Sequence, residues 1–468
     1  MASDVRVLAE NTPATRDRYM DLLRVASLGT VVLGHWLMAA VSTDAAGQVQ
    51  LGNLLAEVPQ LQLLTWAWQI MPVFFFVGGF SHALSYRSLE RKSEDGSSVY
   101  AAFLRARLQR LLRPTMVFIL VWGAAALILQ LIGGSPHLAD ITLRLITQPL
   151  WFIGIYLAMV AFTPPLLKLH ERYGWGAFGG LVAAAAAVDL LRFAAGVPYV
   201  EFLNFAFVWL AVHQLGFLRA DGRLRLPSLL AAPGVLGASA LVAFGPYPLS
   251  MVGMPGEKVS NMAPPTFALL CHGLWLVGAV ELVRRPAARW LRQPKVWRTV
   301  VAANGISMTA FLWHLTAMLG VYGVLLGLDV TLPAPATAAW WAQVPVRLLA
   351  AAVLTAVLVA AFRGFERPAA VRPAPSRRPS GPSPRPAGPS ARTGGSGPLA
   401  ALGITLCLFG VLGLSMVGYG DLLEGHSAML IAFRITAPVA VAMALGGWLL
   451  VERAGRGGAP TRPVRAVS

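Results

Sequence analysis

The sequence predicts an all-α membrane protein, in which a ten-helix transmembrane bundle is followed by a two-helix transmembrane hairpin. Composition is the first indication: 56% of the 468 residues are hydrophobic and 13% are charged, about half the charged share of a soluble chain. The second indication is a series of apolar segments of about 20 residues, long enough to cross a bilayer. The third is that arginine-rich and arginine-poor connections alternate between these segments.

Twelve segments are predicted to span the membrane. Because lipid offers the backbone no hydrogen-bond partners, segments of this length must be helical, and this excludes a β-sheet fold. The first ten are expected to form one body and the last two a hairpin. Their approximate bounds are 22–42, 61–86, 114–133, 148–167, 176–195, 200–218, 228–245, 264–283, 300–326, 344–362, 399–417 and 427–451.

The distribution of positive charge predicts the orientation. Connections such as 87–113 and 284–298 are rich in arginine, whereas 43–60 and 329–340 hold almost none. Such a bias follows the positive-inside rule, so we expect a multi-pass protein of the inner (plasma) membrane with both termini in the cytoplasm. Topology then accounts for the net charge of +17. Membrane lipids, and not nucleic acid, are the expected partners of this charge.

Four parts are predicted along the chain. Residues 1–365 form the ten-helix body. Residues 366–398 are rich in Pro, Arg and Ser and are expected to be a disordered cytoplasmic linker. Residues 399–452 form an accessory transmembrane hairpin, and 453–468 form a basic cytoplasmic tail. The sequence predicts no particular oligomeric state.

Polar residues in the first predicted span suggest where the chemistry of the protein takes place. Arg24 and His35 are eleven residues apart, so they differ by only about 20° around a helix and about 16 Å along it. Asp21 lies on roughly the same stripe. An arginine at the cytoplasmic surface suits a phosphate, and a buried neutral histidine suits a general base. The alternative stays open that Arg24 anchors the helix at the surface and that His35 bonds a neighbouring helix.

Several stretches match a known pattern in the same order. The first span contains D-x-x-R-x(10)-H, at Asp21, Arg24 and His35. The others are MPVFFFVGGFSHALSY in the second span, FLRARLQRLLRP before the third, QPLWFIGIYLAMVAFTPPLL in the fourth, NFAFVWLAVHQLGFLRADGRL in the sixth and ISMTAFLWHLTAM in the ninth. Together they resemble the acyltransferase-3 family of integral-membrane acyltransferases, over about residues 19–362. Each motif alone is weak, but six in this order are specific.

This resemblance implies an O-acyltransferase. Its donor is expected to be cytoplasmic acyl-CoA, in the first place acetyl-CoA, and its acceptor a hydroxyl of a sugar, lipid or metabolite at or across the membrane. His35 is then implied as the general base, and Arg24, Arg107 and Arg110 as the residues that bind the donor's phosphates. Arg107 and Arg110 are three apart on a helix, so they face the same way. Their alternative role is topological anchoring.

Four further residues are candidates for lining the site: Asp21, Trp151, Tyr156 and His314. Trp151 and Tyr156 could line an acyl tunnel or anchor the membrane interface, and His314 is either a second site residue or a packed, hydrogen-bonded one. For His213, packing contacts are the preferred interpretation.

No bound cofactor is expected, since acyl-CoA is a co-substrate. No metal site is predicted either. Cys271 and Cys407 each lie in an apolar run, and no Cys/His cluster has metal-ligand spacing. The main alternative function is a transporter or flippase for a lipid-linked or small polar substrate, which would share the spans and the buried polar residues. A purely structural membrane subunit is the third interpretation.

Overall fold

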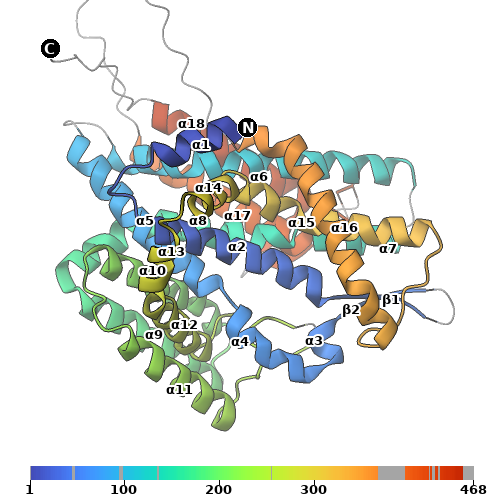
Figure 1. The fold of residues 1–468 in the computed structure, drawn as a ribbon, viewed down its shortest axis with the longest axis horizontal. Helices are drawn as coiled ribbons and strands as arrows, with labels where there is room; N and C mark the ends of the chain where they lie inside the picture. The colour runs from blue at the N-terminus through green and yellow to red at the C-terminus, as the bar shows by residue number, and fades with distance from the viewer. Residues whose placement is uncertain are drawn as a thin grey trace, which may run out of the picture.

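A computed structural model describes residues 2–44, 48–93, 98–133, 136–254, 256–366, 396–420, 422–423, 427–430 and 433–456. Within these ranges the chain is mostly helical (Figure 1). Helices α9 (Trp175–Phe193), α10 (Asn204–Ala220), α11 (Ser228–Phe244) and α12 (Phe267–Leu282) gather on one side of the molecule, in green to yellow-green. Of the helices that hold predicted site residues, α8 (Gln148–Tyr173) contacts α9 and α10 of this group.

The remaining elements complete the fold. In chain order the other helices are α1 (Ala2–Glu10), α2 (Arg18–Met38), α3 (Leu54–Glu57), α4 (Thr65–Trp68), α5 (Met71–Lys92), α6 (Val99–Leu131), α7 (Pro136–Ile146), α8 (Gln148–Tyr173), α13 (Arg284–Trp290), α14 (Pro294–Asn304), α15 (Ser307–Gly327), α16 (Ala338–Phe362), α17 (Gly397–Val417) and α18 (Ala437–Arg456). Short 3₁₀ helices occupy Pro59–Leu64, Val200–Leu203 and Arg363–Phe365. The strands are β1 (Ala39–Thr43), β2 (Val49–Asn53), β3 (Ser427–Leu430) and β4 (Phe433–Thr436).

Nine helical segments of the described chain are long and apolar enough to cross a membrane, or ten if α12 and α13, bent by 49° at their junction, count as one. Each of the twelve predicted segments overlaps a helix. The two that do not meet the criterion are α2, whose first two turns carry Arg18, Asp21 and Arg24, and α11, which has only 17 residues. A multi-pass membrane architecture follows, although a count of ten plus two is not confirmed.

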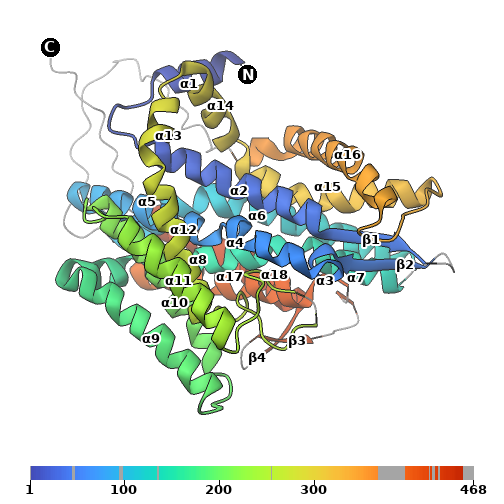
Figure 2. The same cartoon turned by 60° about the horizontal axis from the view of Figure 1, so that its bottom comes forward.

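Two small β-hairpins depart from the all-α prediction. The first span was predicted to run to residue 42, but α2 ends at Met38 and the chain continues as β1, paired antiparallel with β2 (Figure 2). The last span was predicted from residue 427, but β3 and β4 pair there and α18 begins only at Ala437. Val41 of β1 and Ile435 of β4 are apolar and β-branched, and such residues suit strands as well as membrane helices.

The second predicted span, 61–86, lies within one apolar helical segment, Pro59–Glu90, which joins a short 3₁₀ helix, α4 and most of α5. Other boundaries move. The third predicted span starts at 114, whereas α6 begins at Val99 and Pro114 lies inside it. Helices α14 and α15 divide the ninth predicted span at residues 305 and 306. The predicted tail from residue 453 begins within α18, and residues 367–395 of the predicted linker lie outside the described residues.

Helices α5 and α10 cross in close contact. A Cβ atom on Gly79 would collide with the backbone carbonyl of His213, and one on Gly216 would collide with the carbonyl of Phe76. Small residues allow this backbone approach, as is common between membrane helices. The glycines of the FVGGF stretch thus bring the helix that holds His82 against the helix that holds His213.

The terminal hairpin packs against the body. Helix α17 contacts α8, and α18 contacts α6. The Tyr419 hydroxyl donates to the Ile119 carbonyl at 2.9 Å, and Arg105 donates to the Gly455 carbonyl at 2.9 Å. At Gly154 of α8 an added Cβ would collide with the Leu412 side chain of α17. These contacts give the hairpin a fixed position on α6 and α8.

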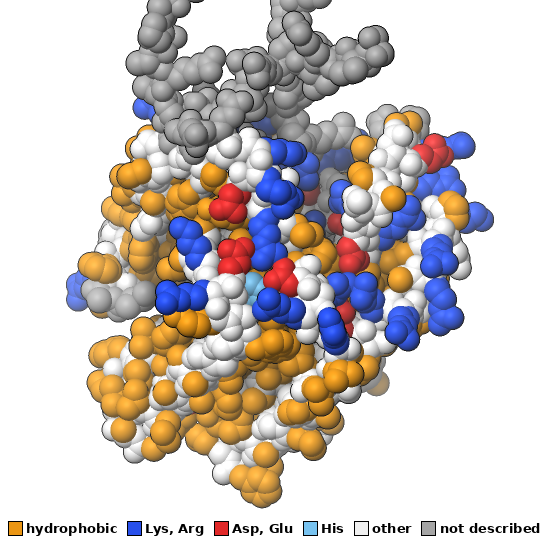
Figure 3. Space-filling view, turned by 90° about the vertical axis from the view of Figure 1, so that its left-hand side faces the viewer, with side chains coloured by type: hydrophobic (Ala, Val, Ile, Leu, Met, Phe, Trp, Pro, Cys, Tyr) orange, Lys and Arg blue, Asp and Glu red, His pale blue; other side chains and the backbone are white. Residues whose placement is uncertain are grey.

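One face of the molecule concentrates charge. In Figure 3, which shows the left-hand side of Figure 1, Lys and Arg side chains gather with Asp and Glu among them, above a broad hydrophobic surface. On a membrane protein such a division separates a water-facing from a lipid-facing surface. The network of Arg87, Asp221 and Glu171 is one set of ion pairs outside the hydrophobic segments.

Candidate active site

His35 and His314 form the central pair of the candidate site. The two rings stack with their centroids 5.0 Å apart, and His35 Nδ1 lies 2.9 Å from His314 Nε2. The Trp36 indole donates to the His314 carbonyl at 3.0 Å, so two consecutive residues of α2 hold α15. The structure therefore brings together two residues that are 279 positions apart in the sequence.

The hydrogen-bond partners of the two rings show which of their nitrogens carry protons. His314 Nδ1 contacts the Phe311 carbonyl, which can only accept, so this nitrogen carries the proton. The Nε2 of a neutral His314 is then an acceptor, and His35 Nδ1 must donate to it. One lone pair remains, on Nε2 of His35. A nitrogen with a lone pair, on a ring whose orientation is held by its other nitrogen, is what a general base requires.

His35 lies nearer to the end of its helix than predicted. It falls in the last turn of α2, just before β1, and its side chain is partly exposed, whereas His314 is buried. Arg24 and His35 were predicted to lie on one face of this helix, but their side chains bond different neighbouring helices. Arg24 reaches α5, and His35 reaches α15.

Arg24 and Arg107 converge on one residue. Arg24 donates to the Ser81 hydroxyl at 3.1 Å, and Arg107 donates to the Ser81 carbonyl at 2.6 Å. Both arginines are only partly exposed, and the Nε of Arg107 is buried without a hydrogen-bond partner among the described residues. Two neighbouring guanidinium groups with unused donors form a cationic site that suits phosphate.

Arg110 occupies a different environment from Arg107. It is exposed and lies within electrostatic reach of Glu366. The Glu366 carboxylate accepts from the Met308 amide at 3.2 Å and from the Thr309 amide at 3.0 Å, so it caps the first turn of the helix that carries His314. Burial raises the pKa of the Glu366 carboxyl, against the opposing effect of these hydrogen bonds and of Arg110. Sequence reasoning assigned Glu366 to the linker because Pro- and Arg-rich sequence follows it.

Asp21 forms an ion pair with nearby Arg16. Arg16 donates to its two carboxylate oxygens at 2.6 and 3.0 Å, and Arg24 lies 3.8 Å away. Asp21 is buried, and its contacts hold the start of α2. The structure thus ties it to Arg24 and not to His35.

Tyr156 belongs to a second histidine pair. Its hydroxyl oxygen lies 2.9 Å from His82 Nε2, and His82 Nδ1 lies 3.0 Å from His213 Nε2. Both histidines are fully buried. Sequence reasoning missed His82 altogether, although an ionisable residue in a predicted span is itself a signal. Trp151 is half-buried and packs against the hydrophobic core.

A charged network borders the cytoplasmic end predicted for α5, α8 and α10. Asp221, at the end of α10, accepts from Arg87 at 2.6 Å and lies 2.9 Å from His170 Nε2. Burial alone would raise the pKa of the Asp221 carboxyl, but its hydrogen bonds to Arg87 and His170 outweigh burial and lower it. The network holds three helices together and contains none of the predicted site residues.

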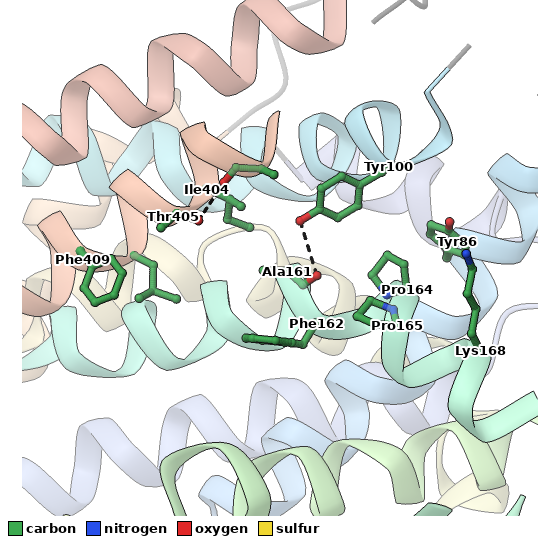
Figure 4. Close-up of a pocket in the computed structure, with 12 residues that line it drawn as sticks. Tyr86, Tyr100, Ala161, Phe162, Pro164, Pro165, Lys168, Ile404, Thr405 and Phe409 are labelled. Carbon is green, nitrogen blue, oxygen red and sulfur yellow. Dashed lines mark hydrogen bonds between the residues drawn. The ribbon is translucent and has the colours of Figure 1, made fainter. Parts of the chain in front are cut away.

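A groove of about 640 Å³ lies where the terminal hairpin meets the body. Figure 4 shows it between α8 and α17, with Lys168 and Tyr86 at one end and Phe409 at the other. The Tyr100 hydroxyl donates across it to the Ala161 carbonyl at 3.5 Å. It is lined by none of the predicted site residues. The groove therefore lies at the interface between the terminal hairpin and the body, and it is separate from the candidate active site.

The described residues contain no group of three or more His, Cys, Asp or Glu side chains that could hold a metal ion. What they do contain is a helical membrane body with a histidine pair and a cluster of arginines inside it. Fold and site together define a multi-pass membrane protein with a buried polar centre. A family model described as an acyltransferase domain, that of the acyltransferase-3 family, matches residues 17–363. The chain belongs to this family and carries a membrane acyltransferase domain. No curated protein and no solved structure matches the chain.

Proposed function

We propose that this membrane acyltransferase moves an acyl group from cytoplasmic acyl-CoA to a hydroxyl of a sugar, lipid or metabolite at or across the membrane. The observation that supports this most is the free lone pair on His35 Nε2, which follows from the contact of His35 Nδ1 with His314 Nε2 at 2.9 Å. Acetyl-CoA is the first donor to test. We also propose the inner membrane as its location, with both termini in the cytoplasm.

In the proposed reaction His35 Nε2 takes the proton of the acceptor hydroxyl. The hydroxyl oxygen attacks the thioester carbonyl carbon and forms the new ester bond. The carbon–sulfur bond then breaks, and the CoA thiolate leaves and takes up the proton that His35 holds. A well-placed general base contributes about 10²- to 10⁴-fold to such a step. His314 acts as a positioning residue, because it fixes the orientation of the His35 ring.

The arginines supply the binding site for the donor in this proposal. Arg24 and Arg107, which meet at Ser81, would bind phosphate oxygens through charge-assisted hydrogen bonds. Arg110, exposed on the same helix as Arg107, would attract the donor at the entrance. Along α2, Arg24 and His35 are separated by about 16 Å, a length that the flexible arm between phosphates and thioester can span.

Release of free CoA thiol tests this function. Purified full-length protein in lipid vesicles is incubated with acetyl-CoA, with and without a panel of hydroxyl acceptors, and free thiol is titrated. We expect thiol release that rises when a suitable acceptor is present. A transporter or flippase would instead move substrate across sealed vesicles without releasing thiol, and that outcome would replace the proposal.

A further inference from the structure

The second histidine pair is a buried polar array that the reaction above does not use. It links three helices: Tyr156 and Thr163 of α8, His82 of α5 and His213 of α10. His82, His213 and Thr163 have no exposed surface, whereas Tyr156 is partly exposed. Tyr156 is therefore the end of the array that a ligand can reach.

Protons can be assigned along this array as well. The single hydroxyl proton of Thr163 is donated to the Met159 carbonyl at 2.8 Å, so Thr163 offers only lone pairs to His82 Nδ1, 3.3 Å away. A proton on His82 Nδ1 satisfies both Thr163 and the Nε2 of His213. His82 Nε2 is then an acceptor, and the Tyr156 hydroxyl donates to it. The oxygen of Tyr156 keeps lone pairs with which it can accept a hydrogen bond from a ligand.

One ring nitrogen of His213 has no hydrogen-bond partner among the described residues, and packing alone does not explain this. With its Nε2 accepting from His82, its Nδ1 carries a proton, yet this atom is buried and has no partner among the described residues. An unsatisfied buried donor costs free energy, and such groups in native proteins call for a reason beyond stability. Fixing the hydroxyl of Tyr156 in one orientation is such a reason.

The position of the array relates it to the arginine site. His82 directly follows Ser81, on which Arg24 and Arg107 converge. Both arginines act electrostatically on the His82 ring, and Arg107 also acts on Tyr156. If a donor binds these arginines by its phosphates, as proposed above, its arm would pass through this neighbourhood on the way to His35. The arm contains amide groups, which lose their water there and need a hydrogen-bond partner.

We propose that Tyr156, held by His82 and His213, is a second donor-binding residue that accepts a hydrogen bond from an amide N–H of the arm of acyl-CoA. Tyr156 is the binding residue, and His82 and His213 are positioning residues. This inference rests on the proposed acyl-CoA function. It separates donor recognition into a phosphate site and an arm site that can be tested independently.

The experiment compares two donors, acetyl-CoA and S-acetylpantetheine, which has the arm but lacks the nucleotide. Tyr156→Phe keeps the ring and removes the hydroxyl, and we expect it to raise KM about five- to tenfold for both donors with little change in kcat. Arg107→Lys should raise KM for acetyl-CoA alone. His272→Gln changes another buried histidine, which contacts the Trp66 carbonyl, and serves as the control with unchanged KM.

Two variants of His82 test its positioning role. A Gln amide reaches the position of Nε2 and can still accept from Tyr156, whereas the shorter Asn amide reaches only the Nδ1 side. His82→Gln should therefore keep KM closer to the wild type than His82→Asn. If either His82 variant is not monodisperse, Tyr156→Phe alone decides. An unchanged KM of Tyr156→Phe for both donors, or a change for acetyl-CoA only, overturns the arm site. Failure of the wild type to release thiol from either donor overturns the proposed function itself and the arm site with it.

Discussion

His35 donates a hydrogen bond from Nδ1 to Nε2 of His314, and the two atoms lie 2.9 Å apart. His314 is held in turn by the Phe311 carbonyl on its own helix. The arrangement resembles a base with an orienting partner, except that the partner is a second histidine and not a carboxylate. Since a neutral partner gives less support to an imidazolium than a carboxylate does, orientation is the main contribution of His314.

Replacement of His35 should abolish transfer without unfolding the protein. We expect His35→Ala and His35→Asn each to lower kcat at least about a hundredfold, because both lack the basic Nε2. Asn retains an amide near the position of Nδ1 and can still bond His314, so it separates loss of the base from loss of packing. The measurement is thiol release at equal amounts of monodisperse protein in the presence of an acceptor. Retention of most activity by His35→Asn would remove His35 from the mechanism.

Replacement of His314 should lower kcat less than replacement of His35, and a suitable side chain at position 314 should restore part of the loss. His314→Leu removes the acceptor for His35 Nδ1, and we expect kcat to fall about tenfold, the worth of one hydrogen bond of about 1.4 kcal/mol. His314→Gln places an amide oxygen where Nε2 was and should recover part of the loss. KM for the donor should not change in either variant. Equal kcat values for the Leu and Gln variants would show that His314 only fills space.

Arginine-to-lysine substitutions should weaken donor binding. Lysine keeps the charge but loses the planar fork of donors, and we expect Arg24→Lys and Arg107→Lys each to raise the Kd for acetyl-CoA about tenfold. Arg110→Lys should have a smaller effect, because Arg110 is exposed. Arg298→Lys, on a partly exposed arginine that bonds the Pro294 carbonyl, is the matched control. If binding isotherms of all three site variants overlay the wild type, the cluster serves topology alone.

Removal of the terminal hairpin should leave catalysis in place. Truncation after Pro368 keeps Glu366 and its contacts to α15 but removes the hydrogen bonds of Tyr419 and Gly455 to the body. Each such bond is worth about 1 kcal/mol, so we expect a Tm lower by several degrees in detergent and nearly normal thiol release. Loss of thiol release from a truncated body that is still folded and monodisperse would place the hairpin in the catalytic machinery.

Much of the architecture could be predicted because membrane helices leave a strong signal. Each of the twelve predicted segments overlaps a helix, since long apolar runs leave the backbone few alternatives. The errors concentrate where apolar residues form short strands, as in β1 and β3, because hydrophobicity alone does not separate a strand from the end of a helix. The sequence predicts a span that starts at Pro114, but Pro114 lies inside α6.

The candidate site was less accessible to sequence reasoning. His35, Arg24 and Arg107 could be selected because they fall in a motif with a chemical rationale. The partnership of His35 with His314 could not, because it depends on how α2 packs against α15. His82 could not be selected for a related reason. The FVGGF stretch before it is recognisable as a motif, but the contact of His82 with His213 depends on how α5 packs against α10. Glu366 was hidden by the composition of the sequence that follows it.

The early end of α2 at Met38 has a consequence for the path between the two sides of the membrane. After its charged first turns, the helix has only the 14 residues from Val25 to Met38, or about 21 Å of length, against about 30 Å for the hydrocarbon core of a bilayer. The apolar part of α2 is therefore shorter than the hydrocarbon core that a full-length span crosses. If donor and acceptor arrive from opposite sides, as proposed above, this short helix would let them meet at His35 without either crossing the full bilayer.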